Sequence, residues 1–509
     1  MEFKITTFDV TTENIKLEQT AELPIDADIS LADYEPDIKK ILKCEIKPYI
    51  SSKRISGNAL GVEGTATLCV IYADSDGVVF STEREVPFKK LFEASSMLDG
   101  GNCEVYITPT TYSCRAVTER KLSIRGSVKI DVNVFVPQKK QILSDIDSSY
   151  FETLSGETQA TTPMGTAEKT FVIDEELALS DSLPSAAKII RSTATPDISE
   201  CRIINNKVIV KGNLNITAFY CAIDGNTCTY KTEIPFNQIV DLVGIGENCE
   251  CDARVTVCNL NLSTRTSQNG ECRSFMLVCK LLVTAMARCE SNVPVIFDIY
   301  STKFEIKPKK EEVCFNKIVY QANDTFSCKK SLSMPEGSAL KVLGLWCLSS
   351  SCTPCFDENG MRLCGSITAC IIAADENDEP VYFERIIDYE YPTQISGTLN
   401  QPKCRPSAEI LKVEYTVSSL GDIELQLDLQ LGATVYDIKT VSLITELEID
   451  ENKTVCSDNT TLIAYYAEEG ENVWEICKSF LADRTELMEI NDIKEDIISS
   501  PCMLLIPKF

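Results

Sequence analysis

Apolar and polar residues alternate with a period of two along much of this chain. The alternation is clearest in three segments, at residues 61–88, 208–236 and 361–389. In each segment two alternating runs flank a polar turn signal, such as Asp76-Gly77 in the first and Asp224-Gly225 in the second. Such a pattern is typical of a half-buried β-hairpin. The sequence therefore predicts three similar hairpins.

The three segments also align with one another through fixed spacings around a glycine inside the first strand. An aromatic residue follows that glycine after 24 residues in every copy, and a lysine with an apolar pair precedes it. This spacing indicates an internal repeat of about 150 residues. A glycine inside a strand predicts a bulge or a close approach of the backbone. The aligned positions are Gly64, Gly212 and Gly365; Phe88, Phe236 and Tyr389; Lys40-Ile41-Leu42, Lys188-Ile189-Ile190 and Lys341-Val342-Leu343.

A second alternating run closes each repeat. Because alternate side chains of a strand lie on one face, several such strands per repeat predict two sheets over one core, as in a β-sandwich. Short helices are expected near the lysine and apolar pair, with Pro36 and Pro184 as their starts. The apolar positions of the closing runs are Leu122, Ile124, Val128, Ile130, Val132, Val134 and Val136; Phe275, Leu277, Cys279, Leu281 and Val283; Ile423, Leu425, Leu427, Leu429 and Leu431.

Polar stretches rich in Ser, Thr, Gly, Lys or Glu are expected to be linkers between domains, at residues 156–169, 307–312 and 451–460. We therefore predict a mainly β, multi-domain protein with three β-sandwich-like repeats and a small α+β module of βααβ order. The predicted domains are residues 1–150, 166–305, 311–450 and 461–509.

The amino-acid composition argues against some classes of partner and location. The chain has 49 Lys and Arg against 76 Asp and Glu, a formal net charge of -27. This charge repels phosphate backbones and anionic lipid surfaces, so we expect no nucleic-acid partner and no binding to a membrane surface. Membrane insertion is not expected either, because an inserted helix needs a long apolar run. The chain shows no apolar run of about 18 residues and no basic, apolar leader at its start. These features predict a cytoplasmic protein.

The sequence contains no histidine. Histidine activates most serine and cysteine nucleophiles and ligates many metals, so we expect no enzyme, no catalytic residues and no cofactor. Cys347, Cys352, Cys355 and Cys364 could in principle form a zinc site, but their spacing lacks two tight pairs. The preferred interpretation is a loop with unpaired thiols. The acidic group from Asp375 to Glu379 is interpreted as a solvated turn. Most of the 24 cysteines are expected to be small buried residues.

The last fifty residues have a different pattern. Trp474, Ile476, Cys477, Phe480, Leu487, Met488 and Ile490 can form one face of two helices over a two-stranded sheet, and Asp483 with Glu486 has the spacing of a capping box. With Gly470-Glu471-Asn472-Val473-Trp474 before the helices and Leu504-Leu505-Ile506-Pro507 as a return strand, this segment resembles a LysM module.

LysM modules that bind glycans hold N-acetyl sugars between the loop after the first strand and the loop before the last. The resemblance implies a groove for a glycan or a partner. No metal site is expected. Glu471-Asn472 and Pro501-Cys502 depart from the usual Asp-Thr and Gly-Gln pairs of that groove. Ile498→Asp is expected to disturb binding without unfolding the module. The groove residues are Gly470, Glu471, Asn472, Val473, Ile497, Ile498, Ser499 and Ser500.

The repeats, over about residues 1–450, resemble SPOCS domains, the β-rich domains of clostridial spore-coat proteins. SPOCS repeats followed by a LysM module are similar to the SipL-type architecture. This resemblance implies a non-enzymatic assembly factor in the mother-cell cytoplasm that is recruited to the forespore surface and spore coat. It would tether coat proteins by binding a morphogenetic ATPase, SpoIVA, with a contribution from the LysM module. The alternative is an anchor that binds peptidoglycan or N-acetylglucosamine in the wall or cortex.

Overall fold

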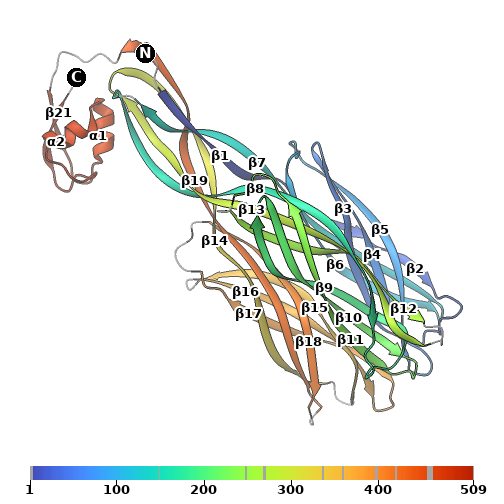
Figure 1. The fold of residues 1–509 in the computed structure, drawn as a ribbon. Coiled ribbons are helices and arrows are strands. Elements are labelled where there is room, and N and C mark those ends of the chain that lie inside the picture. The colour runs from blue at the N-terminus through green and yellow to red at the C-terminus, as the bar shows by residue number, and fades with distance from the viewer. Residues whose placement is uncertain are drawn as a thin grey trace.

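The computed structural model describes residues 4–507 except 148, 247–248, 267–270, 335–337, 358–359, 396–398, 400, 419–420 and 455–461. Most of these residues lie in long antiparallel strands, and helices occur in the C-terminal module (Figure 1). The chain is a mainly β protein with several sheets, as the alternation predicts.

Repeat 1 consists of two sheets. In one, β7 is the central strand, with β1 and β2 on one side and β6 on the other, and in the second β4 lies between β3 and β5. The strands are β1 (Lys4–Pro24), β2 (Ala27–Ser30), β3 (Lys40–Ser56), β4 (Ala59–Ala73), β5 (Val79–Glu93), β6 (Asn102–Thr118) and β7 (Lys121–Asp147).

Repeats 2 and 3 have the same plan. Their first sheets have the orders β8-β13-β12 and β14-β19-β18, and their second sheets have the orders β9-β10-β11 and β15-β16-β17. The strands are β8 (Phe151–Ala178), β9 (Ala186–Ile204), β10 (Lys207–Ala222), β11 (Thr227–Asp241), β12 (Glu250–Thr266), β13 (Cys272–Ser301), β14 (Phe304–Leu332), β15 (Ser338–Asp357), β16 (Gly360–Asp375), β17 (Pro380–Pro392), β18 (Pro402–Val417) and β19 (Ile423–Thr454).

The two sheets of each repeat share one apolar core, to which the closing run of the repeat contributes alternate residues. In β13 every predicted inward residue from Phe275 to Val283 is fully buried. The alternation therefore identified the core face of these strands correctly.

The predicted hairpins are present and their turns are formed by the expected residues. Asp74 accepts hydrogen bonds from the backbone N–H of Asp76 and of Val78, while Gly77 has a positive φ of 77°. In repeat 3 the Asp375 carboxylate accepts from the backbone N–H of Asn377 and of Glu379. The acidic group of this turn thus stabilises the turn itself.

The glycine and the aromatic residue that mark each repeat are direct partners in the β-ladder. Gly64 lies opposite Phe88, and a Cβ atom at Gly64 would come within 2.3 Å of both the Phe88 ring and the carbonyl oxygen of Tyr49. Gly212 and Gly365 are covered in the same way by their aromatic partners. The spacing of 24 residues is therefore set by the hairpin, whose second strand places the aromatic ring over the glycine of the first.

Two local predictions were wrong. The lysine and apolar pairs do not begin helices but open the edge strands β3, β9 and β15. The polar segments 156–169 and 307–312 are not linkers, because they lie inside β8 and β14. In β8, Thr158 and Ala160 are buried by neighbouring strands. A strand that buries small and hydroxyl side chains has no apolar alternation to reveal it.

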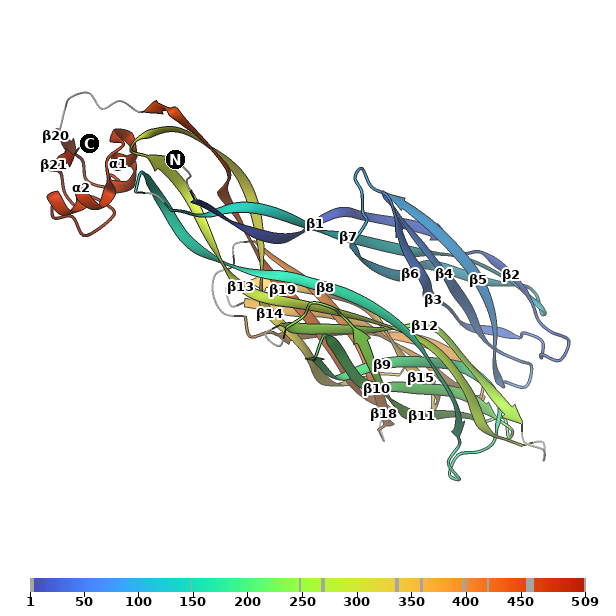
Figure 2. The ribbon, with the colours of Figure 1, turned by 45° about the horizontal axis from the view of Figure 1, so that its top comes forward.

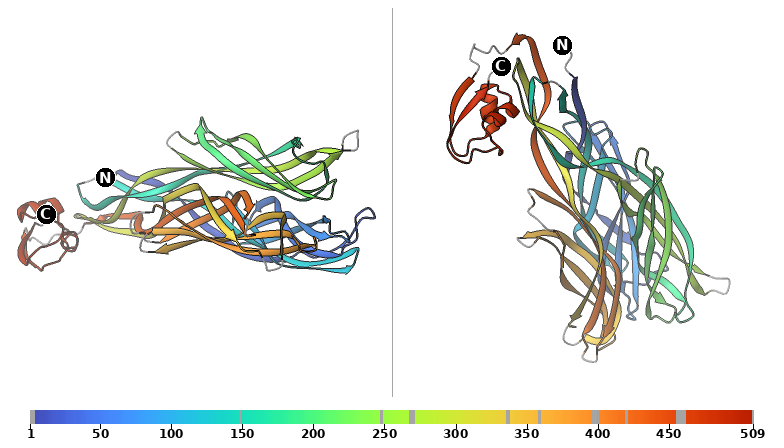
Figure 3. Two further views of the ribbon diagram at one scale, coloured as in Figure 1. Left: turned by 90° about the horizontal axis from the view of Figure 1, so that it is seen from below. Right: turned by 60° about the vertical axis from the view of Figure 1, so that its left-hand side comes forward.

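The repeats are joined by short turns at the end of a common arm. The paired strands β1/β7, β8/β13 and β14/β19 extend beyond their sandwiches and converge there (Figures 1 and 2). Two apolar clusters in this arm contain residues from all three repeats, among them Ile142, Val295 and Phe315. The repeats therefore form one packed assembly, which Figure 3 shows from two further directions.

A third shared cluster lies between the second sheets of the repeats. Ile71 of repeat 1, Phe219 of repeat 2 and Trp346 of repeat 3 are buried in it. At its edge Glu45 accepts hydrogen bonds from Nε of Arg191 at 3.0 Å and from Nε1 of Trp346 at 2.6 Å. Burial alone would raise the pKa of Glu45, but Arg191 and the other donors hold this pKa below its usual value. One residue from each repeat thus closes the interface.

Candidate interaction site

The C-terminal module contains β20 (Leu462–Ala467), α1 (Val473–Phe480), α2 (Arg484–Ile490) and β21 (Cys502–Pro507), and β20 pairs antiparallel with β21. Each helix begins at a capping side chain. The side chain of Asn472 accepts from the N–H of Trp474 at 2.8 Å, and that of Asp483 accepts from the N–H of Glu486 at 2.9 Å. Local sequence signals therefore determine both helix starts.

The core of the module contains most of the residues predicted for it. Trp474, Ile476, Cys477 and Leu487 are buried, together with Ile498 from the loop after α2 and with Leu504 and Ile506 from β21. Phe480 and Met488 pack partly against this core. Ile490 was expected in the core but is 49% exposed, because α2 ends there and its last turn faces solvent.

The two loops of the predicted groove are hydrogen-bonded to each other. The N–H of Gly470 donates to the carbonyl of Ile498 at 2.8 Å, the N–H of Ile498 donates to Glu471 at 2.9 Å, and the N–H of Val473 donates to Asp496 at 2.9 Å. Asn472 and Ile497 form a bridge between the loops. These three backbone amides are therefore already engaged within the protein.

The side chains of the predicted groove divide into two groups. Val473 and Ile498 are buried in the core, so Ile498→Asp would place a charge there. The structure therefore predicts that this change unfolds the module, contrary to the expectation from sequence. Glu471 is half-buried and accepts from the hydroxyl of Tyr465 at 2.8 Å. The residues that face solvent are Gly470, Asn472, Ile497, Ser499 and Ser500.

A second surface of the module was not predicted. Because Ile463 and Tyr465 pack against the core, the alternate residues Leu462, Ala464 and Tyr466 of β20 lie on the outer face of the sheet. Tyr466 is 67% exposed, and its partner across the ladder, Met503, is 65% exposed. The outer face of β20 and β21 is thus an exposed apolar surface, which we call the outer sheet face.

The module is held on the end of the arm by a buried polar contact. Asp298 of β13 accepts hydrogen bonds from Nε1 of Trp474 at 3.0 Å, from Nζ of Lys478 at 2.5 Å and from Nζ of Lys310 at 2.9 Å. Burial alone would raise the pKa of Asp298, but these donors outweigh it and lower the pKa to about 2. Asp298 therefore remains ionised and links the module to repeats 2 and 3.

An aromatic contact completes this attachment. The hydroxyl of Tyr300 donates to the carbonyl of Ala482 at 2.7 Å, and the Tyr300 ring lies 5.0 Å from the ring of Trp474 between centroids. In Figure 2, α1 faces the arm and β20 and β21 lie on the side away from it. The attachment therefore leaves the outer sheet face exposed at the end of the molecule.

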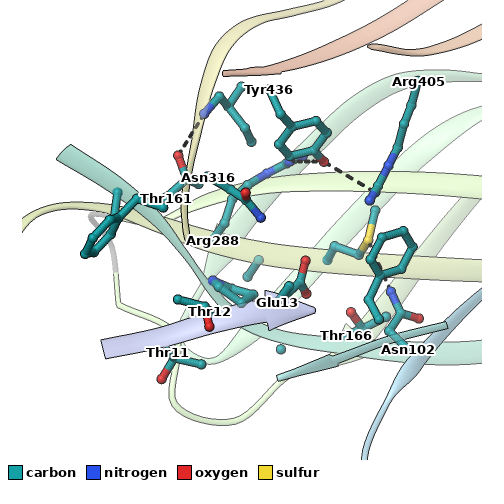
Figure 4. A pocket seen from close by; sticks show the side chains of 18 residues that line it. Thr11, Thr12, Glu13, Asn102, Thr161, Thr166, Arg288, Asn316, Arg405 and Tyr436 are labelled. Atoms are coloured by element: carbon teal, nitrogen blue, oxygen red, sulfur yellow. Dashed lines mark hydrogen bonds between the residues drawn. The ribbon is translucent and has the colours of Figure 1, made fainter. Parts of the chain in front are cut away.

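A small cavity lies where the arm strands of the three repeats meet (Figure 4). Its volume is about 50 Å³, enough for a few water molecules. Arg288 and Arg405 lie at this cavity, each with a guanidinium nitrogen 3.4 Å from the hydroxyl of Tyr436. Arg405 also pairs with Glu104 at 2.8 Å. These side chains bind one another across the three repeats and so help to hold the repeats together.

The four cysteines of the possible zinc site do not lie around one point. Cys347, Cys352 and Cys355 lie along β15, and Cys364 lies on β16. Within the described residues no group of three or more Cys, Asp or Glu side chains is placed to hold a metal ion. In the same part of the chain no helix is long and apolar enough to cross a membrane.

The chain is thus a β-repeat protein with three two-sheet repeats on a shared arm. The buried contacts between its repeats hold them together. A family model described as SipL, SPOCS domain matches residues 37–117 and 185–265. The matches cover β3 to β6 and β9 to β12 and begin at equivalent positions of repeats 1 and 2. Repeats 1 and 2 are therefore SPOCS domains of the SipL type. No curated protein and no solved structure matches it.

Proposed function

We propose that the chain is a non-enzymatic assembly factor of the spore coat and envelope. It tethers coat layers to the forespore through protein–protein contacts, and its LysM-like module contributes to the contact with a morphogenetic ATPase of the SpoIVA type. The SPOCS matches support a role connected with the spore coat. The choice between a protein partner and a glycan partner depends on the surface of the module.

The observation that carries this proposal is the outer sheet face. A contiguous exposed apolar surface favours a protein partner, because burying it removes apolar area from water. Tyr466 and Met503 are large side chains of the kinds enriched in protein interfaces. Glycan binding in the predicted groove would instead require free backbone amides, whereas those of Gly470, Val473 and Ile498 bind the opposite loop.

The attachment of the module to the arm supports the same function. Asp298 and Tyr300 hold α1 against β13, so the outer sheet face has a fixed position relative to the three repeats. A binding surface on a rigid support loses less conformational entropy when a partner binds. The repeats can then present their own edge strands to other coat proteins while the module binds the ATPase.

The test compares the full chain with two variants in a pull-down of the purified morphogenetic ATPase. Tyr466→Asp places a charge in the outer sheet face, whereas Tyr34→Asp changes a tyrosine that is 88% exposed in repeat 1 and serves as the control. We expect Tyr466→Asp to reduce binding at least tenfold and Tyr34→Asp to leave it unchanged.

A parallel sample contains purified peptidoglycan. Sedimentation of the chain with peptidoglycan, together with no binding of the ATPase, would contradict the proposal and favour the wall or cortex anchor. Equal binding of the ATPase by the unmodified chain and by a folded Tyr466→Asp variant would exclude the outer sheet face as the contact.

A further inference from the structure

The two sheets of every repeat meet along one edge where no β-ladder joins them. The strands that lie side by side there are β3 and β6 in repeat 1, β9 and β12 in repeat 2, and β15 and β18 in repeat 3. Because each of these strands pairs only within its own sheet, side chains alone close the sandwich along this edge.

Each of the three edges carries cysteines on both of its strands, which belong to opposite sheets. In repeat 2 the sulfur of Cys201 lies 3.2 Å from that of Cys251. In repeat 1 Cys44 of β3 and Cys114 of β6 pack at the same apolar core, and each shifts the pKa of the other. In repeat 3 Cys352 of β15 and Cys404 of β18 both pack against the shared core of the repeat. None of these six cysteines is in a disulfide.

The cysteine pairs lie on equivalent strands of the repeats, but not at equivalent positions along those strands. Cys251 is equivalent to Cys103 of repeat 1 by the spacing of the repeat glycines, but Cys103 is approached by Lys53 instead of a thiol. Repeat 1 has its own pair, Cys44 and Cys114, further along the same two strands. Repeat 1 therefore lacks the pair found in repeat 2 but has another pair on the same two strands.

We propose that these cross-sheet thiol pairs are oxidation sites, at which a disulfide joins the two sheets of a repeat. The sulfur atoms of Cys201 and Cys251 need to approach by about 1 Å to reach the bond length of about 2.05 Å. The oxidant is a low-molecular-weight disulfide such as oxidised glutathione. The thiolate of Cys251 attacks it and releases one thiol, and Cys201 then attacks the mixed disulfide and releases the second.

The environment of each pair suits this reaction. The hydrogen bond from Cys201 lowers the pKa of Cys251, and the thiol of Cys44 lowers the pKa of Cys114. A thiolate is the nucleophile in disulfide exchange, so Cys251 and Cys114 are the attacking groups. Both are only half-buried, which leaves them accessible to a small oxidant.

The experiment uses the full chain, which is reduced, treated with oxidised glutathione, alkylated and digested without reductant for mass spectrometry. We expect peptides that join Cys201 to Cys251 and Cys44 to Cys114. The disulfide between Cys249 and Cys289, which the structure contains, serves as the internal reference. We also expect oxidation to raise the apparent Tm by about 5–10 °C, because each bond constrains the unfolded chain.

Two matched variants complete the test. Cys251→Ser should leave Cys201 open to alkylation and should remove part of the rise in Tm, whereas Cys103→Ser changes the equivalent cysteine of repeat 1 and should leave both cross-links unchanged. If Cys249 and Cys289 pair again while Cys201 and Cys44 remain alkylated, the proposal is wrong. Pairing of Cys201 with a cysteine other than Cys251 in the unmodified chain would also overturn it.

Discussion

The carboxylate of Glu45 in repeat 1 binds the guanidinium of Arg191 in repeat 2 at 3.0 Å, and both side chains are buried between the repeats. Removal of one member of a buried ion pair leaves the other charged and unpaired. We therefore expect Glu45→Ala to lower the free energy of unfolding by about 3–5 kcal/mol.

Denaturant unfolding followed by circular dichroism measures this change. Glu63→Ala is the control, because Glu63 pairs with Lys89 on the exposed surface of the same repeat, where an ion pair contributes little. If the two variants unfold alike, Glu45 does not contribute to the interface in the way that its burial indicates.

The attachment of the module should depend on pH through Asp298. The pKa of this carboxyl is lowered from 3.8 to about 2 in the folded protein, so the stabilisation that it provides is present above about pH 4 and is lost as the pH falls toward 2. We expect amide hydrogen exchange in α1 and at the end of β13 to increase over this range.

Asp298→Asn should increase the same exchange already at pH 7 and should remove its dependence on pH below 4. Asp145→Asn, at a more exposed carboxylate near the end of β7, is the control and should retain the behaviour of the unmodified chain. Protection in α1 that persists in the Asp298→Asn variant would show that Asp298 is not needed to hold the module.

The repeat glycines should not accept a methyl group. Gly64→Ala would bring the new Cβ atom within 2.3 Å of both the Phe88 ring and the backbone of Tyr49, so we expect a loss of about 2–3 kcal/mol of stability. Gly246→Ala is the matched change, since no heavy atom lies within 4 Å of a Cβ at that position. Thermal unfolding of the two variants distinguishes crowding from a general effect of losing glycine, which would shift both Tm values equally.

Neighbouring isoleucines in the module should respond in opposite ways to a charge. Ile498 is 4% exposed and Ile497 is 56% exposed, so Ile498→Asp should unfold the module while Ile497→Asp should not. Hydrogen exchange of α1 and α2 in the full chain reports which outcome occurs. A folded module in the Ile498→Asp variant would contradict the assignment of this side chain to the core.

The local structure of the repeats could be predicted because its signals are local. Alternation identified the inward residues of β13 and β19, and Asp-Gly pairs identified hairpin turns. The predicted hairpin also accounts for the repeat spacing, because a hairpin places residues at a fixed separation side by side and Gly64 lies opposite Phe88.

The contacts between repeats could not be predicted in the same way. Glu45 lies 301 residues from Trp346, and Asp298 lies 180 residues from Lys478. No spacing in a single sequence connects such positions. The arm strands were missed for a related reason, because three repeats bury them jointly and their small or polar side chains give no two-residue period. The outer sheet face was missed because alternation does not say which face of a two-stranded sheet is covered.

The geometry of the arm has a mechanical consequence. The chain leaves β19 at Thr454 on its way to the module, and β19 pairs with β14 from there to the opposite end, at Ile423 and Leu332. A force applied to the module along the arm would pull β19 parallel to its neighbour, so the hydrogen bonds of that ladder would share the load rather than break one after another. In the proposed tethering role, this ladder would resist separation of the two layers along its whole length.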